Sequence, residues 1–385
     1  MIPPEWSEYR DRVSGLTVRQ LTNYKGHSYH TYFTNSGWYD GGKRLIFGSD
    51  RANETNLFSV DLTTGAITQV THFPRVPGED MVNALQDVCV NPNRNEAYFW
   101  LKRDLIALDL HSGAHRIIYH AAEGLLHHSN SCTADGQFIC TCLAEDLSDR
   151  IEMDLSHGFI GFEEYFTARP HCQILRVAVD GSRSDIMHEE DCWIGHVNPS
   201  PTHPQLLSFC HEGPWNLVDQ RIWGFDLNTG RAWKIRPTEK GDALGHEYWL
   251  ADGESLGYHG CVGGKNLFGF VRYDNTGHEE FPMDHGSDHY FSNDRNLIIS
   301  DGPGGVDQVV LFRRKDGAIG APRTLCQHRS SRHVQITHVH PRLTADSRQV
   351  LFTSDRSGYG NLYLVDIPED VESLPVLNFK VSGTT

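Results

Sequence analysis

A repeated unit constrains the fold of this chain more than any other feature of its sequence. Each unit has a turn, an apolar strand, a polar turn and a second apolar strand that ends in aspartate. The first copy runs through residues 45–51 and 56–65, and the last through 350–356 and 361–367. The two ends of the chain therefore carry the same supersecondary structure.

Five weaker copies lie between these two, which brings the number of units to seven. Asp-Gly and Asn-Asp turn signals come just before the strand that opens a pair, as hairpin connections require. Asp61 and Asp109 are 48 residues apart, within the range of about 40–50 residues for propeller repeats. The strand pairs of the weaker copies are 97–100 with 108–110, 138–140 with 174–177, 206–209 with 225–227, 256–258 with 267–270, and 297–299 with 309–312.

This pattern predicts an all-β fold, a seven-bladed β-propeller that forms a single domain over residues 1–385. A four-stranded sheet cannot bury both of its faces alone, and stacking the sheets radially buries them. Residues 16–22, which precede the first repeat, are expected to supply an N-terminal strand that closes the last blade. The insertion at about 146–169 is too long for a turn within a blade, and it is expected to form a rim loop or lid, or else to cover a sheet edge.

Composition limits the classes of partner. Hydrophobic residues make up 38% of the chain and charged residues 22%, which is typical of a globular protein with a large core. The net charge of −16 argues against nucleic acid and anionic membranes as partners. No apolar run of 18 residues and no signal-like N-terminal stretch occurs, and the nine cysteines lack a CxxC pair, so a cytoplasmic location with reduced thiols is expected.

Histidines stand where the innermost strands of three neighbouring blades are expected to begin. His246 opens the fifth unit, His289 the sixth, and His338 and His340 the seventh. Innermost strands line the central channel, so these side chains should converge, with His338 and His340 on one face of a strand. We expect one divalent metal ion bound by His289, Gln335, His338 and His340, with open positions for water or a substrate carboxylate. His285 could replace His289, and an HxH pair alone is more often a surface or hydrogen-bonded core feature.

Other polar residues lie near the predicted channel. Arg221 could grip a carboxylate through a bidentate pair, although an ordinary surface pair with Asp219 or Glu212 would also explain it. His211 and His196 are candidates for substrate binding or for returning a proton. Arg51, in the Ser-Asp-Arg string of the first unit, is expected to bind substrate with them.

Four strings of the sequence, in this order along nearly the whole chain, resemble the oligogalacturonate lyases, polysaccharide lyase family twenty-two. The strings are Cys210–Pro214, His246–Trp249, Gln335–Pro341 and Leu351–Asp355. The resemblance implies a cytoplasmic seven-bladed propeller with a manganese-type divalent ion, in which His246 is the Brønsted base and Arg221 assists. It also implies the same four metal ligands.

The chemistry of such a lyase suits these residue types. β-Elimination removes the C5 proton beside a carboxylate and expels the O4 substituent, so a cation that binds the carboxylate stabilises the charge that develops. A neutral imidazole, with an unperturbed pKa of roughly 6.5, can take the proton at neutral pH. The net negative charge favours a short acidic oligosaccharide, such as digalacturonate, over a long polyanion. The alternatives are a lyase for another uronate, a non-catalytic TolB-like propeller without a tight metal site, and a peptidase propeller, for which the chain lacks a GxSxG elbow.

Overall fold

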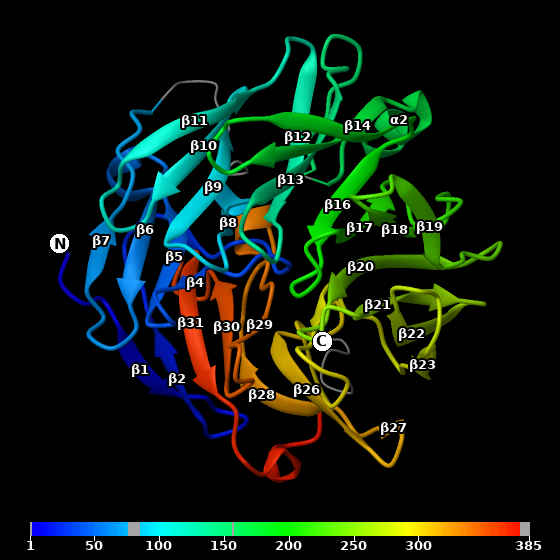
Figure 1. Ribbon diagram of the computed structural model, residues 1–385. Coiled ribbons are helices and arrows are strands. Elements are labelled where there is room, and N and C mark those ends of the chain that lie inside the picture. The colour runs from blue at the N-terminus through cyan, green and yellow to red at the C-terminus, as the bar shows by residue number, and fades with distance from the viewer. Residues whose placement is uncertain (1, 76–84, 156–157, 378–385) are drawn as a thin grey trace.

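The computed structural model describes residues 2–75, 85–155 and 158–377. Its strands form seven antiparallel sheets, which Figure 1 shows arranged as blades around a common centre. The prediction of an all-β, seven-bladed propeller is therefore confirmed. None of the helices within these ranges combines the length and the hydropathy that a membrane crossing requires.

Each blade is numbered in chain order and runs from its innermost strand outward. Blades 1 to 3 consist of β3 (Ser28–Tyr29), β4 (Trp38–Tyr39), β5 (Arg44–Ser49), β6 (Asn56–Asp61) and β7 (Ile67–Gln69); β8 (Cys89–Val90), β9 (Glu96–Leu101), β10 (Asp104–Asp109) and β11 (His115–His120); and β12 (Leu125–Cys132), β13 (Phe138–Glu145), β14 (His171–Ala178) and β15 (Ser184–Asp191).

Blades 4 to 7 follow the same plan, and the last one takes its outer strands from the N-terminus. They consist of β16 (Ile194–Pro199), β17 (Leu206–His211), β18 (Ile222–Asp226) and β19 (Arg231–Arg236); β20 (Ala243–Trp249), β21 (Ser255–Val262), β22 (Lys265–Arg272) and β23 (Glu279–Pro282); β24 (Tyr290–Phe291), β25 (Leu297–Ser300), β26 (Gln308–Lys315), β27 (Ala318–Ile319) and β28 (Arg323–Gln327); and β29 (Arg342–Leu343), β30 (Gln349–Ser354), β31 (Asn361–Asp366), β2 (Thr17–Gln20) and β1 (Ser7–Arg10). In the part of the chain that the structure describes, three short 3₁₀ helices, at Arg51–Asn53, Gln335–Thr337 and Val371–Ser373, lie outside the sheets.

The strand pairs expected from the repeat are the second and third strands of the blades. In β5 and β6 nearly every residue is buried, because neighbouring blades cover both faces of these central strands. The outermost strands β11 and β15 are largely exposed, and they lack such apolar runs. This difference explains why the sequence shows two clear strands in each unit rather than four.

The aspartate that ends many units holds a turn. Oδ1 of Asp61 accepts hydrogen bonds from the backbone N–H groups of Thr63 and Thr64, both at 2.9 Å. Asp109 and Asp226 make the same pair of contacts to the residues two and three positions later. A side chain that satisfies two backbone donors fixes the hairpin between the third and fourth strands, which gives the repeat a physical cause.

The N-terminal segment closes the ring, as expected. In β2, Val18 pairs with Val365 and Gln20 with Tyr363 of β31, and β1 adds a further strand outside β2. Figure 1 shows the blue N-terminal strands beside the red C-terminal ones. Thr22 strengthens this junction, because its Oγ1 donates to Oδ1 of Asn361 at 2.9 Å in the buried interior.

The largest apolar core spans blades 5, 6 and 7 together with β2. Phe352 and Tyr363 are fully buried in it, with stacked rings 5.3 Å apart. Burying one such side chain contributes roughly 1.5–3 kcal/mol. The three blades that carry His246, His289 and His338 therefore share one hydrophobic core.

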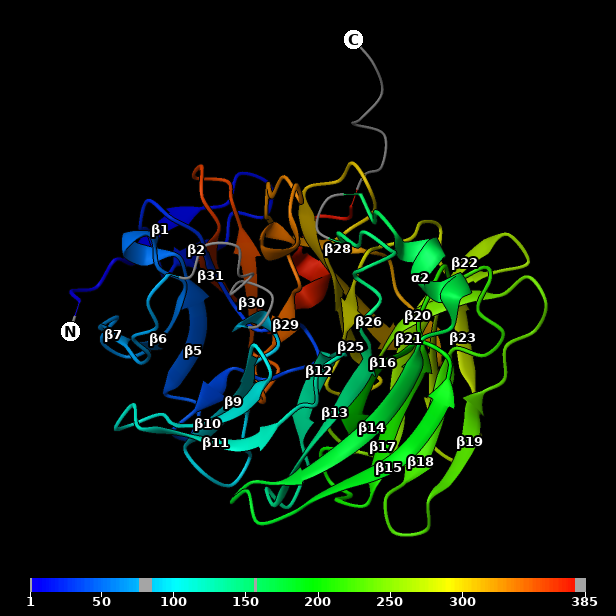
Figure 2. The same cartoon turned by 90° about the horizontal axis from the view of Figure 1, so that it is seen from above.

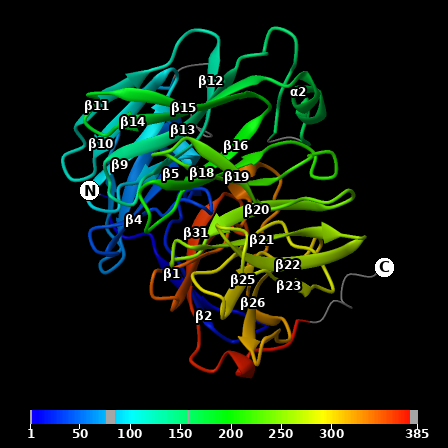
Figure 3. The ribbon, with the colours of Figure 1, turned by 45° about the vertical axis from the view of Figure 1, so that its right-hand side comes forward.

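The insertion between β13 and β14 contains the α-helix α2 (Phe162–Ala168). The rings of Phe162 and Tyr165 pack edge-on against Trp193, at 5.2 and 4.8 Å. Figures 2 and 3 show α2 at the periphery of the ring.

Candidate active site

A pocket of about 1690 Å³ opens where the innermost segments of the blades converge. Because all seven blades contribute to its wall, the pocket lies over the central axis. The insertion contributes too, through residues that include Met153, Leu155 and Phe159, so it forms a wall of the pocket rather than only covering an edge. Representative wall residues from the successive blades are Tyr32, Asp87, His128, His196, His246, His289 and His338.

Bulges in the innermost strands turn side chains toward this pocket. The pairing register shifts around Ser129 in β12, His196 in β16 and His246 in β20. These residues have φ values of 48°, 47° and 47°, and His340 of blade 7 has a φ of 42°. Left-handed backbone is costly for residues other than glycine and is concentrated at functional sites. The same strained bulge thus recurs around the channel and re-aims one residue in each strand.

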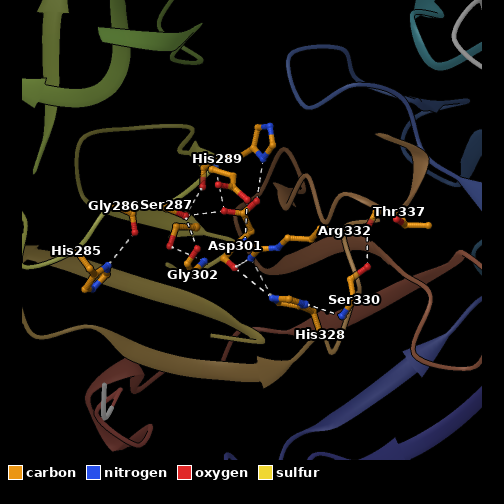
Figure 4. A network of polar contacts seen from close by, with 12 residues as sticks. His285, Gly286, Ser287, His289, Asp301, Gly302, His328, Ser330, Arg332 and Thr337 are labelled. Atoms are coloured by element: carbon orange, nitrogen blue, oxygen red, sulfur yellow. Dashed lines mark hydrogen bonds and ion pairs between the residues drawn. The ribbon is translucent and has the colours of Figure 1, made fainter. Parts of the chain in front are cut away.

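His289, His338 and His340 gather into one cluster. Each offers a ring nitrogen, and these three nitrogens lie within 4.8 Å of one another. The ring centroids of His289 and His340 are 4.3 Å apart. His285 does not join the group, and Figure 4 shows it on the far side of Ser287. The structure therefore favours His289 over His285 as the third member.

The expected strand geometry around His338 is wrong. Gln335–Thr337 form a 3₁₀ helix, and the innermost strand of blade 7 begins only at Arg342. His338 follows the helix with extended backbone, and His340 reaches the cluster through its left-handed conformation. Strand alternation is thus not what brings the two histidines together. Gln335 lines the same pocket from the 3₁₀ helix.

Asp301 orients His289 within the cluster. Its Oδ2 lies 2.8 Å from Nδ1 of His289, and its Oδ1 accepts from the His289 backbone N–H and the Ser287 hydroxyl. Figure 4 shows this network, in which Arg332 also contacts the backbone oxygen of Asp301. A carboxylate behind one ring nitrogen leaves the other, Nε2, to face a ligand, as in histidine–metal sites.

The three imidazoles fit a divalent cation chemically. Burial lowers the pKa of His289 and His340 well below the usual value, and it lowers the pKa of His338 as well. Neutral rings present the lone pairs that a metal requires. Nε2 of His340 is buried without a hydrogen-bond partner, and an unpaired buried polar atom is costly unless something binds it.

His246 stands directly beside this cluster. Its ring stacks on that of His289, with centroids 4.6 Å apart. Nδ1 lies 2.5 Å from the backbone oxygen of Asp288, and because a carbonyl can only accept, Nδ1 carries the proton and Nε2 keeps a lone pair. Burial, reinforced by His289, holds the pKa of His246 well below its ordinary value. The ring is therefore an unprotonated base at neutral pH.

Arg221 lies in the pocket wall, but it is buried rather than on the surface. Its Nη1 donates to Glu212 at 2.7 Å and its Nε to Glu247 at 3.1 Å. Although burial opposes ionisation of Glu247, Arg221 and His196 keep the pKa of that carboxyl below its usual range. The anticipated pairing with Glu212 is present, and Glu247 is a second partner that sequence reasoning missed.

His196 shares these two carboxylates. Its Nδ1 lies 3.2 Å from Oε1 of Glu247, and its Nε2 lies 3.7 Å from Oε2 of Glu212. Together with Cys210, His196 and Glu247 have the spacing of a possible metal group. The guanidinium of Arg221 on the same carboxylate argues against a second cation there.

Two of the predicted substrate-binding residues lie away from the pocket wall. Arg51 is buried in a bidentate pair with Glu5, at 2.5 and 2.8 Å. His211 ends β17 and contacts Glu190 and Asp219, both at 3.2 Å. The structure thus assembles His196, Arg221, His246 and the histidine cluster in one place, but it brings neither Arg51 nor His211 to them.

Three residues of this site were not predicted from the sequence. Tyr32 contacts both the histidine cluster and His196, with its ring 5.1 Å from that of His340 and 5.8 Å from that of His196. Its position just after the innermost strand of blade 1 is the signal that could have revealed it. Asp301 and Glu247 carry no such signal, because each contacts a histidine from a different part of the sequence: Asp301 contacts His289, and Glu247 contacts His196.

The chain is similar to known proteins along nearly its whole length. The family model described as oligogalacturonate lyase matches residues 1–309. An oligogalacturonide lyase of Pectobacterium atrosepticum is 25% identical over 96% of this chain and 98% of its own length. An oligogalacturonate lyase of Dickeya dadantii is 26% identical over 94% and 96%.

Solved structures agree with these matches. A structure of oligogalacturonate lyase in complex with manganese superimposes with a TM-score of 0.85 at 25% identity, covering 96% of this chain and 98% of that one. An oligogalacturonate lyase from Vibrio parahaemolyticus gives the same TM-score and coverage at 22% identity, which speaks for the fold. Because the family model matches well over half of the sequence, the chain belongs to the oligogalacturonate lyase family.

Proposed function

We propose that this protein cleaves short oligogalacturonates, such as digalacturonate, by metal-dependent β-elimination. The observation that carries the proposal is the contact of His246 with the histidine cluster, in which a neutral base stacks on His289 at 4.6 Å. Elimination next to a carboxylate needs a base and a cation side by side. Membership of the lyase family supports the same reaction.

One divalent ion is proposed for the cluster, and manganese is our choice because a solved relative was obtained with it. The four residues that would hold it combine three imidazole nitrogens with one amide oxygen, which suits several divalent ions. When bound, the ion would supply Lewis-acid stabilisation of the substrate carboxylate. The proposed ligands are His289, Gln335, His338 and His340.

The chain's own residues then perform the elimination. Nε2 of His246 takes the C5 proton, a C4–C5 double bond forms, and the C4–O4 bond breaks with its electron pair going to the oxygen of the departing sugar, which is protonated to free galacturonate. The ring that lost its C5 proton becomes a 4,5-unsaturated uronate, which can rearrange to the 4-deoxy-5-keto form. Asp288 keeps His246 in the reactive tautomer through its backbone oxygen.

Arg221 is assigned an assisting role. Its guanidinium places a fixed positive charge in the pocket wall, and such preorganised charge stabilises the negative charge that develops on the substrate. Glu212 and Glu247 hold the group in position but offset its charge. Arg51 and His211 receive no role in substrate binding.

Charge favours short substrates. The protein carries a net charge of −16, and acidic side chains such as Asp87, Glu152 and Asp288 line the pocket. A long polyanion would be repelled by these groups, whereas a fragment of two sugars places its carboxylates only beside the metal cluster and Arg221.

The test is an assay of digalacturonate with manganese, with chelator, and with the His246→Ala variant. We expect ultraviolet absorbance of the unsaturated product with manganese alone, and a much lower rate on intact polygalacturonate. Cleavage of another uronate oligosaccharide but not of digalacturonate would change the substrate class. No product from any uronate, despite tight manganese binding, would favour a non-catalytic binding module.

A further inference from the structure

His196 holds in blade 4 the position that His246 holds in blade 5. Each follows a glycine, sits at a bulge with a φ of 47°, and lines the central pocket. Their rings are almost parallel, with an interplanar angle of 6° and centroids 6.1 Å apart. The fold thus presents two equivalent imidazoles from neighbouring blades to one ligand.

The surroundings of the two rings are opposite in character. His246 donates from Nδ1 to a backbone carbonyl and is packed against Phe33, Trp215 and His289. His196 instead faces two carboxylates at ion-pair distance, Glu247 at 3.2 Å and Glu212 at 3.7 Å. Such a contrast between paired groups is the arrangement that separates an acid from a base.

The charged side chains beside His196 carry a negative excess. Glu212 and Glu247 contribute two negative charges, and Arg221, which binds both, contributes one positive charge. Asp87 interacts electrostatically with His196 as well. Charges this close in a buried site interact strongly.

Neither ring nitrogen of His196 is tied up in a short hydrogen bond to these carboxylates. Oε1 of Glu247, whose side chain is fully buried, lies at an ion-pair distance of 3.2 Å from Nδ1, but the two atoms do not meet hydrogen-bond geometry. The 3.7 Å between Nε2 and Glu212 is longer than a hydrogen bond, so Nε2 remains available to a ligand in the pocket.

We propose that His196 is the catalytic acid that protonates the leaving oxygen. This inference rests on the proposed elimination. As Nε2 of His246 takes the C5 proton and the double bond forms, the electron pair of the broken C4–O bond goes to the departing oxygen. That oxygen receives the Nε2 proton of His196, and solvent later restores both rings. In galacturonate the C5 hydrogen and the O4 substituent lie on opposite faces of the sugar, so the acid and the base must be separate groups.

The test compares two substrates whose leaving groups differ in their need for a proton. Digalacturonate must expel a sugar oxygen, which needs a proton, whereas a 4-O-(4-nitrophenyl) galacturonide expels a stabilised phenolate that does not. The variant is His196→Asn, because asparagine tolerates left-handed backbone. His196→Gly serves if that variant fails to fold, and His203→Asn, in the β16–β17 turn of the same blade, is the matched control.

With manganese bound, we expect His196→Asn to lower kcat/KM on digalacturonate by about 10²–10⁴-fold, the usual contribution of a general acid. On the nitrophenyl substrate it should stay within about threefold of the wild-type protein, whereas His246→Ala should fail on both. Calorimetry should give unchanged manganese affinity for His196→Asn, which shows that the pocket is intact.

Equal losses of His196→Asn on the two substrates, or an unchanged rate on digalacturonate, would overturn the assignment while leaving the lyase function in place. A manganese-loaded wild-type protein that cleaves neither substrate would overturn the proposed function, and the role of His196 with it.

Discussion

Oδ2 of Asp301 lies 2.8 Å from Nδ1 of His289, and the other oxygen of the same carboxylate holds the His289 backbone N–H at 2.9 Å. The carboxylate therefore fixes both the ring and the backbone of one proposed metal ligand. Removing its charge while keeping its shape tests how much the cluster depends on this support.

The Asp301→Asn variant should bind manganese about 10–100-fold more weakly, the usual effect of losing such a partner. Isothermal titration of the metal-free protein measures this directly. Asp307→Asn changes a carboxylate that pairs with Arg329 in an exposed loop, and it should leave the affinity unchanged. Equal affinities for Asp301→Asn and the wild-type protein would show that His289 needs no orientation by Asp301.

The pH dependence of the reaction should reflect the buried state of His246. Its pKa lies well below the ordinary 6.5 because of burial and the neighbouring His289, and only the neutral ring can accept the C5 proton. Activity should therefore fall on the acid side, below about pH 6.5, and be level through neutrality. A kcat/KM profile in manganese-loaded protein with an acid midpoint above pH 7 would contradict this role.

His211 should contribute to stability rather than to catalysis. Although burial opposes its charge, Cys192 and Glu190 raise the pKa of His211 to about 10. A pKa raised in the folded state stabilises fully below pH 6.5, and the benefit disappears as the pH rises toward 10. His211→Gln should lower the free energy of unfolding by roughly 2 kcal/mol near pH 6, and by less than about 1 kcal/mol near pH 10. Denaturant unfolding at both pH values checks this, and an equal cost at both would refute the explanation.

The backbone at Gly213 packs closely against helix α2 of the insertion. Its φ is 141°, and a Cβ there would lie 2.3 Å from the ring of Phe166 in α2. Gly213→Ala should lower the free energy of unfolding by roughly 2–4 kcal/mol, through backbone strain and overpacking. Adding Phe166→Ala should recover part of that loss by removing the clash. A double variant no more stable than Gly213→Ala would show that the ring contact does not matter.

Much of the architecture could be predicted because repetition links position in the sequence to position in space. The central strands and the aspartate of each turn recur with the blade, and this periodicity placed His246, His289, His338 and His340 at one mouth of the ring. The local geometry could not be predicted in the same way. A 3₁₀ helix and a left-handed residue, rather than strand alternation, bring His338 and His340 together.

Partners of the site residues were harder to predict than the residues themselves. Glu247 follows His246 directly, so simple alternation would place it on the opposite face of the strand. At the bulge, His246 lines the pocket while Glu247 contacts His196 and Arg221. Arg51 and His211 have suitable chemistry, but their ion pairs with Glu5 and Glu190 hold them away from the pocket wall. Residue type alone does not distinguish a residue that lines the pocket from one that is held in an ion pair elsewhere.

The pairing of β2 with β31 joins residues more than 300 positions apart in the sequence. During synthesis the N-terminal strand must wait for the last repeat to emerge before it finds its neighbour, since contacts of such long range form late. Blade 7 also carries His338 and His340. The proposed metal centre is thus completed only in the final stage of folding, because a nascent chain that lacks its last repeat also lacks two of the proposed ligands.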